Sequence, residues 1–247
     1  MIKRVLKDLA LVYMDDVLIA SEILAEAFQQ LEDVLKALRA NNLTLNLTKC
    51  RFFQKNLDYL GREISEEGVR PGAYKVEAVL KATDPQNIKQ VRQFLGPAGY
   101  FRKFIQDFAR KASPLTDLLR KDVPWRWGPK ESKAVKELKQ VLVDRPVLAI
   151  YDPTLETEVH TDASAVGLGA ILFQKDENGK RVVAYYSRKT TPEEPKYHSH
   201  DLETLAVVVA LQTFRVYLLG IKFTVVIVLP IVVRFGLQRI KRISSLE

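Results

Sequence analysis

The chain has 247 residues, of which 47% are hydrophobic and 28% are charged. This composition is typical of a globular protein with a buried core and not of a disordered chain. The net charge of +8 favours a polyanionic partner such as nucleic acid. Cys50 is the only cysteine, so an internal disulfide is excluded and a reducing compartment is expected. The apolar stretch 223–233 is too short to span a bilayer.

The first motif is the stretch 11–20, in which two apolar runs flank Asp15 and Asp16. The pattern predicts a β-hairpin with both carboxylates at its turn. Adjacent carboxylates repel one another unless a cation neutralises them, and Mg²⁺ prefers oxygen ligands. A bare Asp-Asp pair is more simply interpreted as an exposed turn. However, Tyr13-Met14 stands directly before the pair, and the stretch resembles the Tyr-x-Asp-Asp box of reverse transcriptases.

The remainder of the first segment extends this resemblance. Apolar spacing predicts a helix from Ser21 to about Ala40, a half-buried strand over 43–47, and a hairpin that turns at Gly68. The stretches 43–49, 50–52, 59–61 and 64–69 resemble gypsy-type LTR retrotransposon reverse transcriptases, in the order of that family. The resemblance implies that residues 1–72 are the C-terminal half of a polymerase palm. It also implies that Asp15 and Asp16 are catalytic ligands of Mg²⁺ or Mn²⁺.

The two-metal chemistry of such polymerases needs a further aspartate from an earlier palm strand. Only ten residues precede Leu11, and Asp8 is too close to the hairpin to be that aspartate. We therefore expect no polymerase activity from this sequence.

Residues 73–121 combine basic and aromatic side chains at helical spacing. Asp84-Pro85 predicts a helix start, and Gly96-Pro97 is predicted to end that helix before a second one begins at Ala98. A third helix is predicted over 114–119. The charge pattern fits either a solvated face over an aromatic core or contact with phosphates, which glycine at the bend would allow to approach closely.

The stretch 94–105 resembles the thumb of the same family, which grips the primer–template duplex. The resemblance implies that the nucleic-acid-binding residues are Arg92, Gly96, Tyr100, Arg102 and Lys103. Residues 122–152 resemble the connection that follows the thumb. They contain a predicted helix over 130–143 and no apparent catalytic group.

Residues 153–247 alternate like strands over 158–164, 170–173 and 182–186, followed by a helix over 201–219 and a strand over 222–226. Three antiparallel strands, a helix and a strand are the order of a ribonuclease H fold. His160 and Asp162 are predicted to share one face. Glu203 is predicted in the first helical turn, where the helix dipole favours a carboxylate, so an ordinary helix-end residue is its alternative interpretation. His198 and His200 are predicted in a solvated loop.

The stretches 161–164 and 201–206 resemble the first two acidic motifs of the ribonuclease H of this family. Asp162 and Glu203 would then be catalytic metal ligands that act on an RNA–DNA hybrid. The third aspartate of the family follows a Phe-Thr-Val-Val run, but here 227–232 is an apolar run, and the final helix and last acid of the family are also missing. We therefore expect little or no nuclease activity.

Together, the sequence predicts an α+β protein: a partial reverse-transcriptase palm with a helical thumb, followed by an incomplete ribonuclease H-like domain. The expected function is that of an impaired retrotransposon polymerase and ribonuclease H fragment acting on RNA–DNA hybrids or primer–template duplexes. The alternative is a catalytically silent nucleic-acid-binding remnant or a host-recruited interaction module. We expect no membrane partner. We expect association with other polyprotein fragments and a location in the cytoplasm or nucleus.

Overall fold

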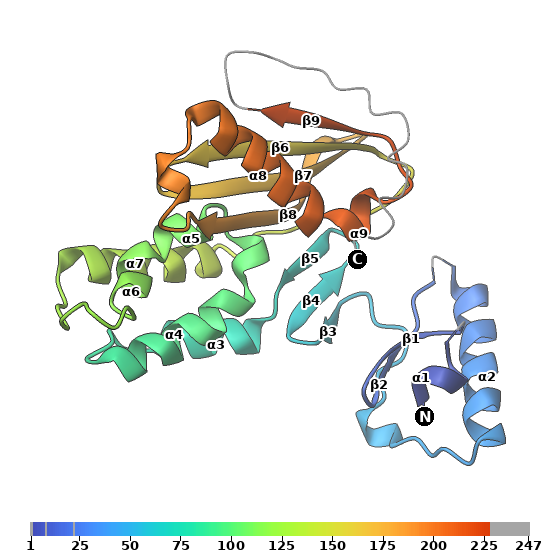
Figure 1. The fold of residues 1–247 in the computed structure, drawn as a ribbon. Coiled ribbons are helices and arrows are strands. Elements are labelled where there is room, and N and C mark those ends of the chain that lie inside the picture. Colours follow the sequence, from blue (N-terminus) through green and yellow to red (C-terminus); the bar gives the residue numbers. More distant parts are fainter. Residues whose placement is uncertain (1, 8, 22, 228–247) are drawn as a thin grey trace, which may run out of the picture. The chain divides into compact units, whose positions relative to one another are not determined.

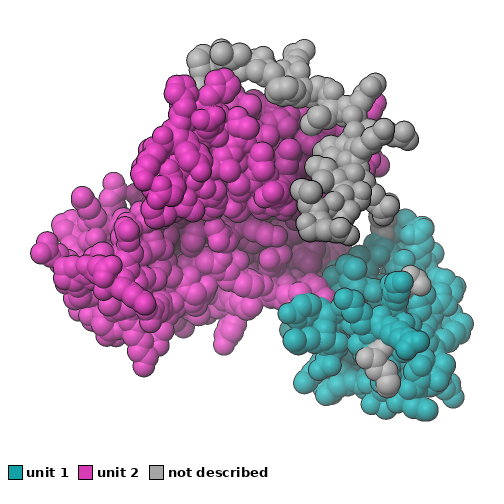
Figure 2. All heavy atoms as spheres, viewed as in Figure 1, with its two compact units in different colours: residues 1–54 teal, residues 55–247 magenta. Residues whose placement is uncertain are grey.

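A computed structural model describes residues 2–7, 9–21 and 23–227. The chain is a mixed α+β protein that forms two compact units, unit 1 over residues 1–54 and unit 2 over residues 55–247 (Figure 2). Asp8 and the stretch 228–247, on which some sequence expectations rest, lie outside the described residues.

Unit 1 is a short hairpin with a long helix. Its elements are α1 (Ile2–Val5), β1 (Leu11–Tyr13), β2 (Asp16–Leu18), α2 (Leu24–Ala40) and the 3₁₀ helix η1 (Leu47–Lys49). Leu6, Val34 and Leu38 form its core. The predicted helix to Ala40 is confirmed, but the strand over 43–47 is wrong. The Asn46 side chain accepts a hydrogen bond from the Thr48 N–H at 3.1 Å, which starts η1 in place of an extended strand.

Unit 2 begins with an antiparallel three-stranded sheet of β3 (Leu57–Tyr59), β4 (Arg62–Ser65) and β5 (Gly68–Pro71). The predicted hairpin is confirmed, but Glu66 and Glu67 form its turn and Gly68 is the first residue of β5. Gly68 has φ +135°, and an added Cβ would lie 2.2 Å from the Leu148 carbonyl oxygen, so only glycine fits there. The helix α3 (Ala73–Lys81), which the sequence analysis did not predict, follows directly.

Helix α4 (Ile88–Tyr100) differs from the prediction at both ends. It begins after Asn87, whose side chain accepts from the Gln90 N–H at 3.0 Å, so Asp84-Pro85 precedes the helix. It also continues through Pro97 instead of ending there. Proline removes one backbone hydrogen bond, and the nearness of Pro97 to the helix end limits the number of turns affected.

Short helices and one long helix complete this helical region. They are η2 (Arg102–Phe104), α5 (Phe108–Lys111), α6 (Ser113–Asp117) and α7 (Pro129–Val143). The long helix predicted from Ala98 is thus wrong, whereas α7 is confirmed. The core of the region contains fully buried Val91, Phe101, Ile105, Leu115 and Leu138.

The last part of unit 2 is a four-stranded sheet with the order β8-β7-β6-β9. Its elements are β6 (Glu156–Ser164), β7 (Gly167–Asp176), β8 (Gly179–Lys189), η3 (Glu194–Lys196), α8 (Ser199–Thr213), α9 (Arg215–Leu218) and β9 (Phe223–Ile227). Strands β6 to β8 are antiparallel, and β9 runs parallel to β6. Helix α8 lies against this sheet (Figure 1), with Val159 packed among Ala210 and Phe214. The predicted strand and helix order is confirmed.

The helical region contacts β8 of this sheet directly. The Arg102 guanidinium donates to the Ser187 carbonyl at 2.5 Å, and the Ala109 N–H donates to the Ser187 hydroxyl at 2.9 Å. Lys189 also pairs with Asp117 at 2.8 Å. These contacts join segments about eighty residues apart in sequence.

Candidate active sites and nucleic-acid interface

The β1–β2 hairpin places its two aspartates differently. Tyr13 pairs with Asp16 across the hairpin, so Met14 and Asp15 form the turn and Asp16 is the first residue of β2. The prediction of a hairpin is confirmed, but only Asp15 lies at the turn itself. Met14 adopts φ +51°, a left-handed conformation that methionine rarely takes. Both carboxylates are exposed, so a cation has open access to them.

Asp162 and Glu203 are brought together from different elements of unit 2. Asp162 lies on β6 opposite Gly169, and its side chain is exposed. Glu203 lies on α8 and is only 7% exposed, and its Oε2 atom has no hydrogen-bond partner among the residues that the structure describes. Burial raises the pKa of Glu203, and the negative charge of Asp162 raises it further, against a smaller lowering by the Ala163 N–H and His200.

Glu203 does not lie in the first turn of α8, where the helix dipole would favour a carboxylate. Helix α8 begins at Ser199, with His198 as its N-cap, so Asp201 is the acidic residue of the first turn. Glu203 lies further along the helix than predicted, and its pKa is raised instead of lowered. The prediction that Glu203 lies in the first turn of this helix is therefore wrong.

The Asp162–Glu203 pair fits part of a divalent metal site. Two nearby carboxylates, one of them with a buried oxygen that has no partner, are stabilised when a cation binds between them. Over the described ranges 2–7, 9–21 and 23–227, no three His, Cys, Asp or Glu side chains are grouped as a metal site. The pair would thus supply only part of a full ligand set.

Three of the predicted nucleic-acid-binding residues share one face of α4. Arg92, Gly96 and Tyr100 are spaced by four residues and are all exposed, whereas Val91 and Phe94 face the core. An added Cβ at Gly96 would meet nothing within 4 Å, so the helix surface there is open. We name Arg92, Gly96 and Tyr100 the α4 stripe.

The end of the α4 stripe is surrounded by cations that the sequence analysis did not identify. Lys75 Nζ lies 4.2 Å from the centre of the Tyr100 ring, and the Arg62 guanidinium lies 5.8 Å from it. The Tyr100 hydroxyl donates to the Leu60 carbonyl, which holds the ring in place. Lys75 lies on the unpredicted α3 and Arg62 on β4, so neither position carried a signal in the sequence.

Arg102 and Lys103 lie apart from the α4 stripe, in η2. Arg102 donates to the Ser187 carbonyl, and its guanidinium lies 5.7 Å from the centre of the Phe108 ring. Burial lowers the pKa of Lys103, and the neighbouring positive charge of Arg62 lowers it further. Arg102 is therefore engaged by β8, whereas Lys103 lies near Arg62, which is also a neighbour of Tyr100.

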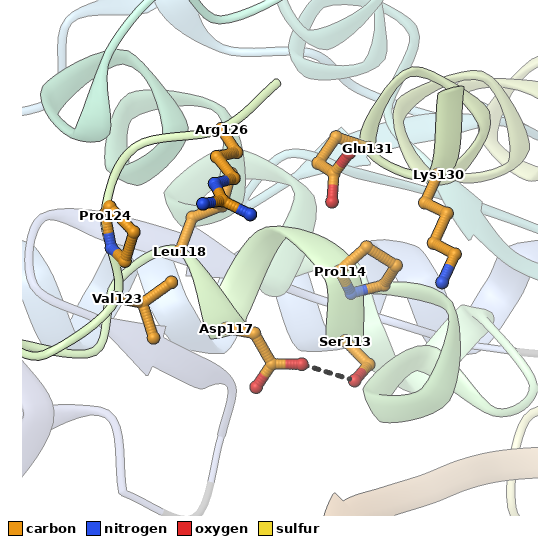
Figure 3. A pocket seen from close by; sticks show the side chains of 9 residues that line it. All are labelled: Ser113, Pro114, Asp117, Leu118, Val123, Pro124, Arg126, Lys130 and Glu131. Carbon is orange, nitrogen blue, oxygen red and sulfur yellow. Dashed lines mark hydrogen bonds between the residues drawn. The ribbon is translucent and has the colours of Figure 1, made fainter. Parts of the chain in front are cut away.

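A cavity of about 570 Å³ is lined by residues of α6, of α7 and of the segment between them (Figure 3). Asp117 accepts a hydrogen bond from Ser113 within it, at 3.2 Å. None of the residues predicted as a site lines this cavity. Its lining residues are Ser113, Pro114, Asp117, Leu118, Val123, Pro124, Arg126, Lys130 and Glu131.

Across the part of the chain that the structure describes, no helix has the length and apolar character needed to cross a membrane.

Two family models match the chain. The reverse transcriptase (RNA-dependent DNA polymerase) family matches residues 1–64, and the RNase H-like domain found in reverse transcriptase matches residues 127–225. The Tf2-3 and Tf2-7 transposon polyproteins of Schizosaccharomyces pombe are 41% and 40% identical over 207 residues, or 83% of this chain. The chain spans 16% of the length of these relatives.

Solved structures of the foamy viral protease-reverse transcriptase share the fold. The complex with dsDNA has a TM-score of 0.81 at 22% identity and covers 93% of this chain and 48% of that one. The complex with RNA/DNA hybrid has a TM-score of 0.80 at 22% identity and covers 92% and 31%. Together with the motifs at Asp15-Asp16, Asp162 and Glu203, these matches show that the chain belongs to the reverse transcriptases of gypsy-type LTR retrotransposon polyproteins, with an RNase H-like domain.

Proposed function

We propose that the chain binds a nucleic-acid duplex, either an RNA–DNA hybrid or a primer–template, through the α4 stripe. The observation that carries this proposal is the alignment of Arg92, Gly96 and Tyr100 on one exposed helix face. The related foamy viral enzyme binds dsDNA and RNA/DNA hybrid, which supports a duplex as the partner.

Each residue of the α4 stripe has a distinct part in this binding. Among the described residues Arg92 has no ion-pair partner, so its guanidinium is available to a phosphate oxygen. Gly96 leaves the helix surface flat, which allows a sugar–phosphate backbone to approach closely. Tyr100 presents an aromatic ring beside Lys75, whose ammonium adds positive charge at the end of the stripe.

For chemistry, we propose that Asp162 and Glu203 hold Mg²⁺ or Mn²⁺ and that hydrolysis of RNA–DNA hybrids is impaired. When bound, such ions stabilise the attacking and leaving oxygens of a phosphodiester. The Asp162 side chain is exposed to solvent. Among the described residues, the Oε2 atom of Glu203 has no hydrogen-bond partner and is available to a metal ion. The sequence 227–232, where the family has its third aspartate, contains no carboxylate, which supports the impairment. Asp15 and Asp16 are proposed as metal ligands of the polymerase region on their motif alone.

Duplex binding is tested by fluorescence anisotropy of a labelled RNA–DNA hybrid and a DNA duplex over a series of salt concentrations. Arg92→Ala is the test variant, and Lys136→Ala, an exposed lysine on α7, is the matched control. We expect Arg92→Ala to weaken binding and to lower its salt dependence, whereas Lys136→Ala leaves both unchanged. Equal effects of the two variants would refute the α4 stripe as the binding surface.

Catalysis is tested separately, by incubating the same hybrid with Mg²⁺ and then Mn²⁺. We expect no cleavage above that of Asp162→Asn. Cleavage that Asp162→Asn abolishes would show that the site is competent and that the proposed impairment is wrong.

A further inference from the structure

A second cavity, of about 170 Å³, lies within unit 2 between β4, β5, η2, the segment 148–151, β8 and α9. Its walls are largely aliphatic or aromatic, and it is lined by no Asp or Glu. The lining residues are Arg62, Val69, Lys103, Phe104, Leu148, Ala149, Ile150, Tyr151, Val183 and Tyr217.

The cavity contains two cationic side chains, Arg62 and Lys103, without a counter-ion. Among the described residues, the buried Nε atom of Arg62 has no hydrogen-bond partner, and neither side chain forms an ion pair. The guanidinium of Arg62 lies 6.0 Å from the centre of the Phe104 ring. A buried donor that makes no hydrogen bond costs free energy, and two like charges held close together cost more.

The pKa of Lys103 is consistent with this arrangement. Burial lowers it, and the positive charge of Arg62 lowers it further. An anion between the two groups would offset the repulsion between them, because it would supply acceptors to Arg62 and a negative charge to Lys103.

The walls limit the size of that anion. The Tyr151 hydroxyl already donates to the Tyr217 carbonyl, so this side of the cavity offers a ring and not a free donor. Pockets for drug-sized ligands hold about 300–1,000 Å³, so this cavity suits a single small group.

We propose that the cavity binds one phosphate group between the Arg62 guanidinium and the Lys103 ammonium. The group belongs either to a free phosphate or to the backbone of a nucleic acid. None of the three residues of the α4 stripe lines this cavity, so inorganic phosphate alone serves as the probe of the site. Arg62 supplies planar donors, and Lys103 supplies a mobile point charge.

The first test uses the unmodified full chain, so it does not depend on a variant that folds. Lysines are acetylated with a limiting amount of reagent, with inorganic phosphate or with chloride at equal ionic strength, and each site is quantified by mass spectrometry. We expect phosphate to slow acetylation of Lys103 several-fold and to leave Lys136 unchanged. Equal rates at Lys103 with and without phosphate would overturn the proposal.

The second test measures phosphate binding by isothermal titration calorimetry on Arg62→Gln and on Arg120→Gln, an exposed arginine used as the control. We expect Arg62→Gln to weaken binding about tenfold, because a charge-assisted pair is lost, and Arg120→Gln to have no effect. Equal effects of the two variants would overturn the proposal.

Duplex affinity of the same variants identifies the source of the phosphate. Weaker duplex binding by Arg62→Gln but not by Arg120→Gln supports a backbone phosphate, and unchanged duplex binding with lost phosphate binding supports a free phosphate. Failure of the proposed duplex function is recognised separately, since it would leave Arg92→Ala without effect while phosphate still binds at Arg62.

Discussion

Arg102 and Arg92 lie ten positions apart in one basic region, and the structure predicts opposite consequences of replacing them by alanine. Arg102 donates to the Ser187 carbonyl at 2.5 Å and lies 5.7 Å from the centre of the Phe108 ring. A hydrogen bond from a charged donor contributes about 1.5–3 kcal/mol, and an exposed cation–π contact about 0.5–1 kcal/mol. Because the side chain is partly solvated, we expect Arg102→Ala to lower the free energy of unfolding by about 2 kcal/mol.

Arg92 has no such contact on its exposed helix face, so Arg92→Ala should change the free energy of unfolding by less than about 0.5 kcal/mol. It should instead reduce the slope of log affinity against log salt concentration by about one, because one phosphate contact is lost. Arg102→Ala should leave that slope unchanged.

Urea unfolding followed by circular dichroism gives the stabilities, and anisotropy of a labelled duplex over a salt series gives the slopes. The reasoning would be refuted if Arg102→Ala lowered the slope and left stability unchanged. That result would place Arg102 on the duplex and would mean that its contact with Ser187 contributes nothing.

Three further predictions concern other groups. Arg188 holds the pKa of Glu194 at about 2, so the Arg188–Glu194 ion pair stabilises the fold above the ordinary carboxyl pKa, and this contribution is lost as the pH falls toward 2. Between about pH 6 and pH 3.5, the wild type should lose about 1 kcal/mol more stability than Glu194→Gln in urea titrations. Parallel curves of stability against pH for the two proteins would contradict this. The raised pKa of Glu203 means that ionising this side chain is unfavourable in the folded protein. Glu203→Gln should therefore raise the midpoint of thermal unfolding at neutral pH, and this gain should disappear as the pH falls through the raised pKa toward the ordinary carboxyl range. A lower midpoint for Glu203→Gln would show that the fold stabilises the carboxylate. Gly96→Leu should not reduce stability, because the added side chain meets open space and leucine favours helix. It should nevertheless weaken duplex binding about tenfold. Unchanged duplex affinity in anisotropy titrations would place the duplex elsewhere.

The sequence predicted elements whose signal is local and periodic. The apolar spacing of 24–40 and 129–143 was sufficient for α2 and α7, and strict alternation was sufficient for β6. It did not predict η1, where the Asn46 side chain competes with an extended strand, or the passage of α4 through Pro97. At η1 a single side chain outweighed the local strand propensity, and in α4 the packing of the whole region outweighed the helix-breaking propensity of proline.

The candidate sites show a similar division between residue type and environment. Motifs were sufficient to select Asp162 and Glu203, but the depth of Glu203 in α8 and its unpartnered oxygen depend on packing between β6 and α8. Arg102 lies within the stretch 94–105 that resembles the thumb of the family, yet its partner, Ser187, lies 85 residues away. Arg62 matched no binding motif and faces Lys103 only because β4 and η2 meet in unit 2. Motifs therefore identify which residues belong to the family, whereas long-range packing decides which side chains remain available to a ligand.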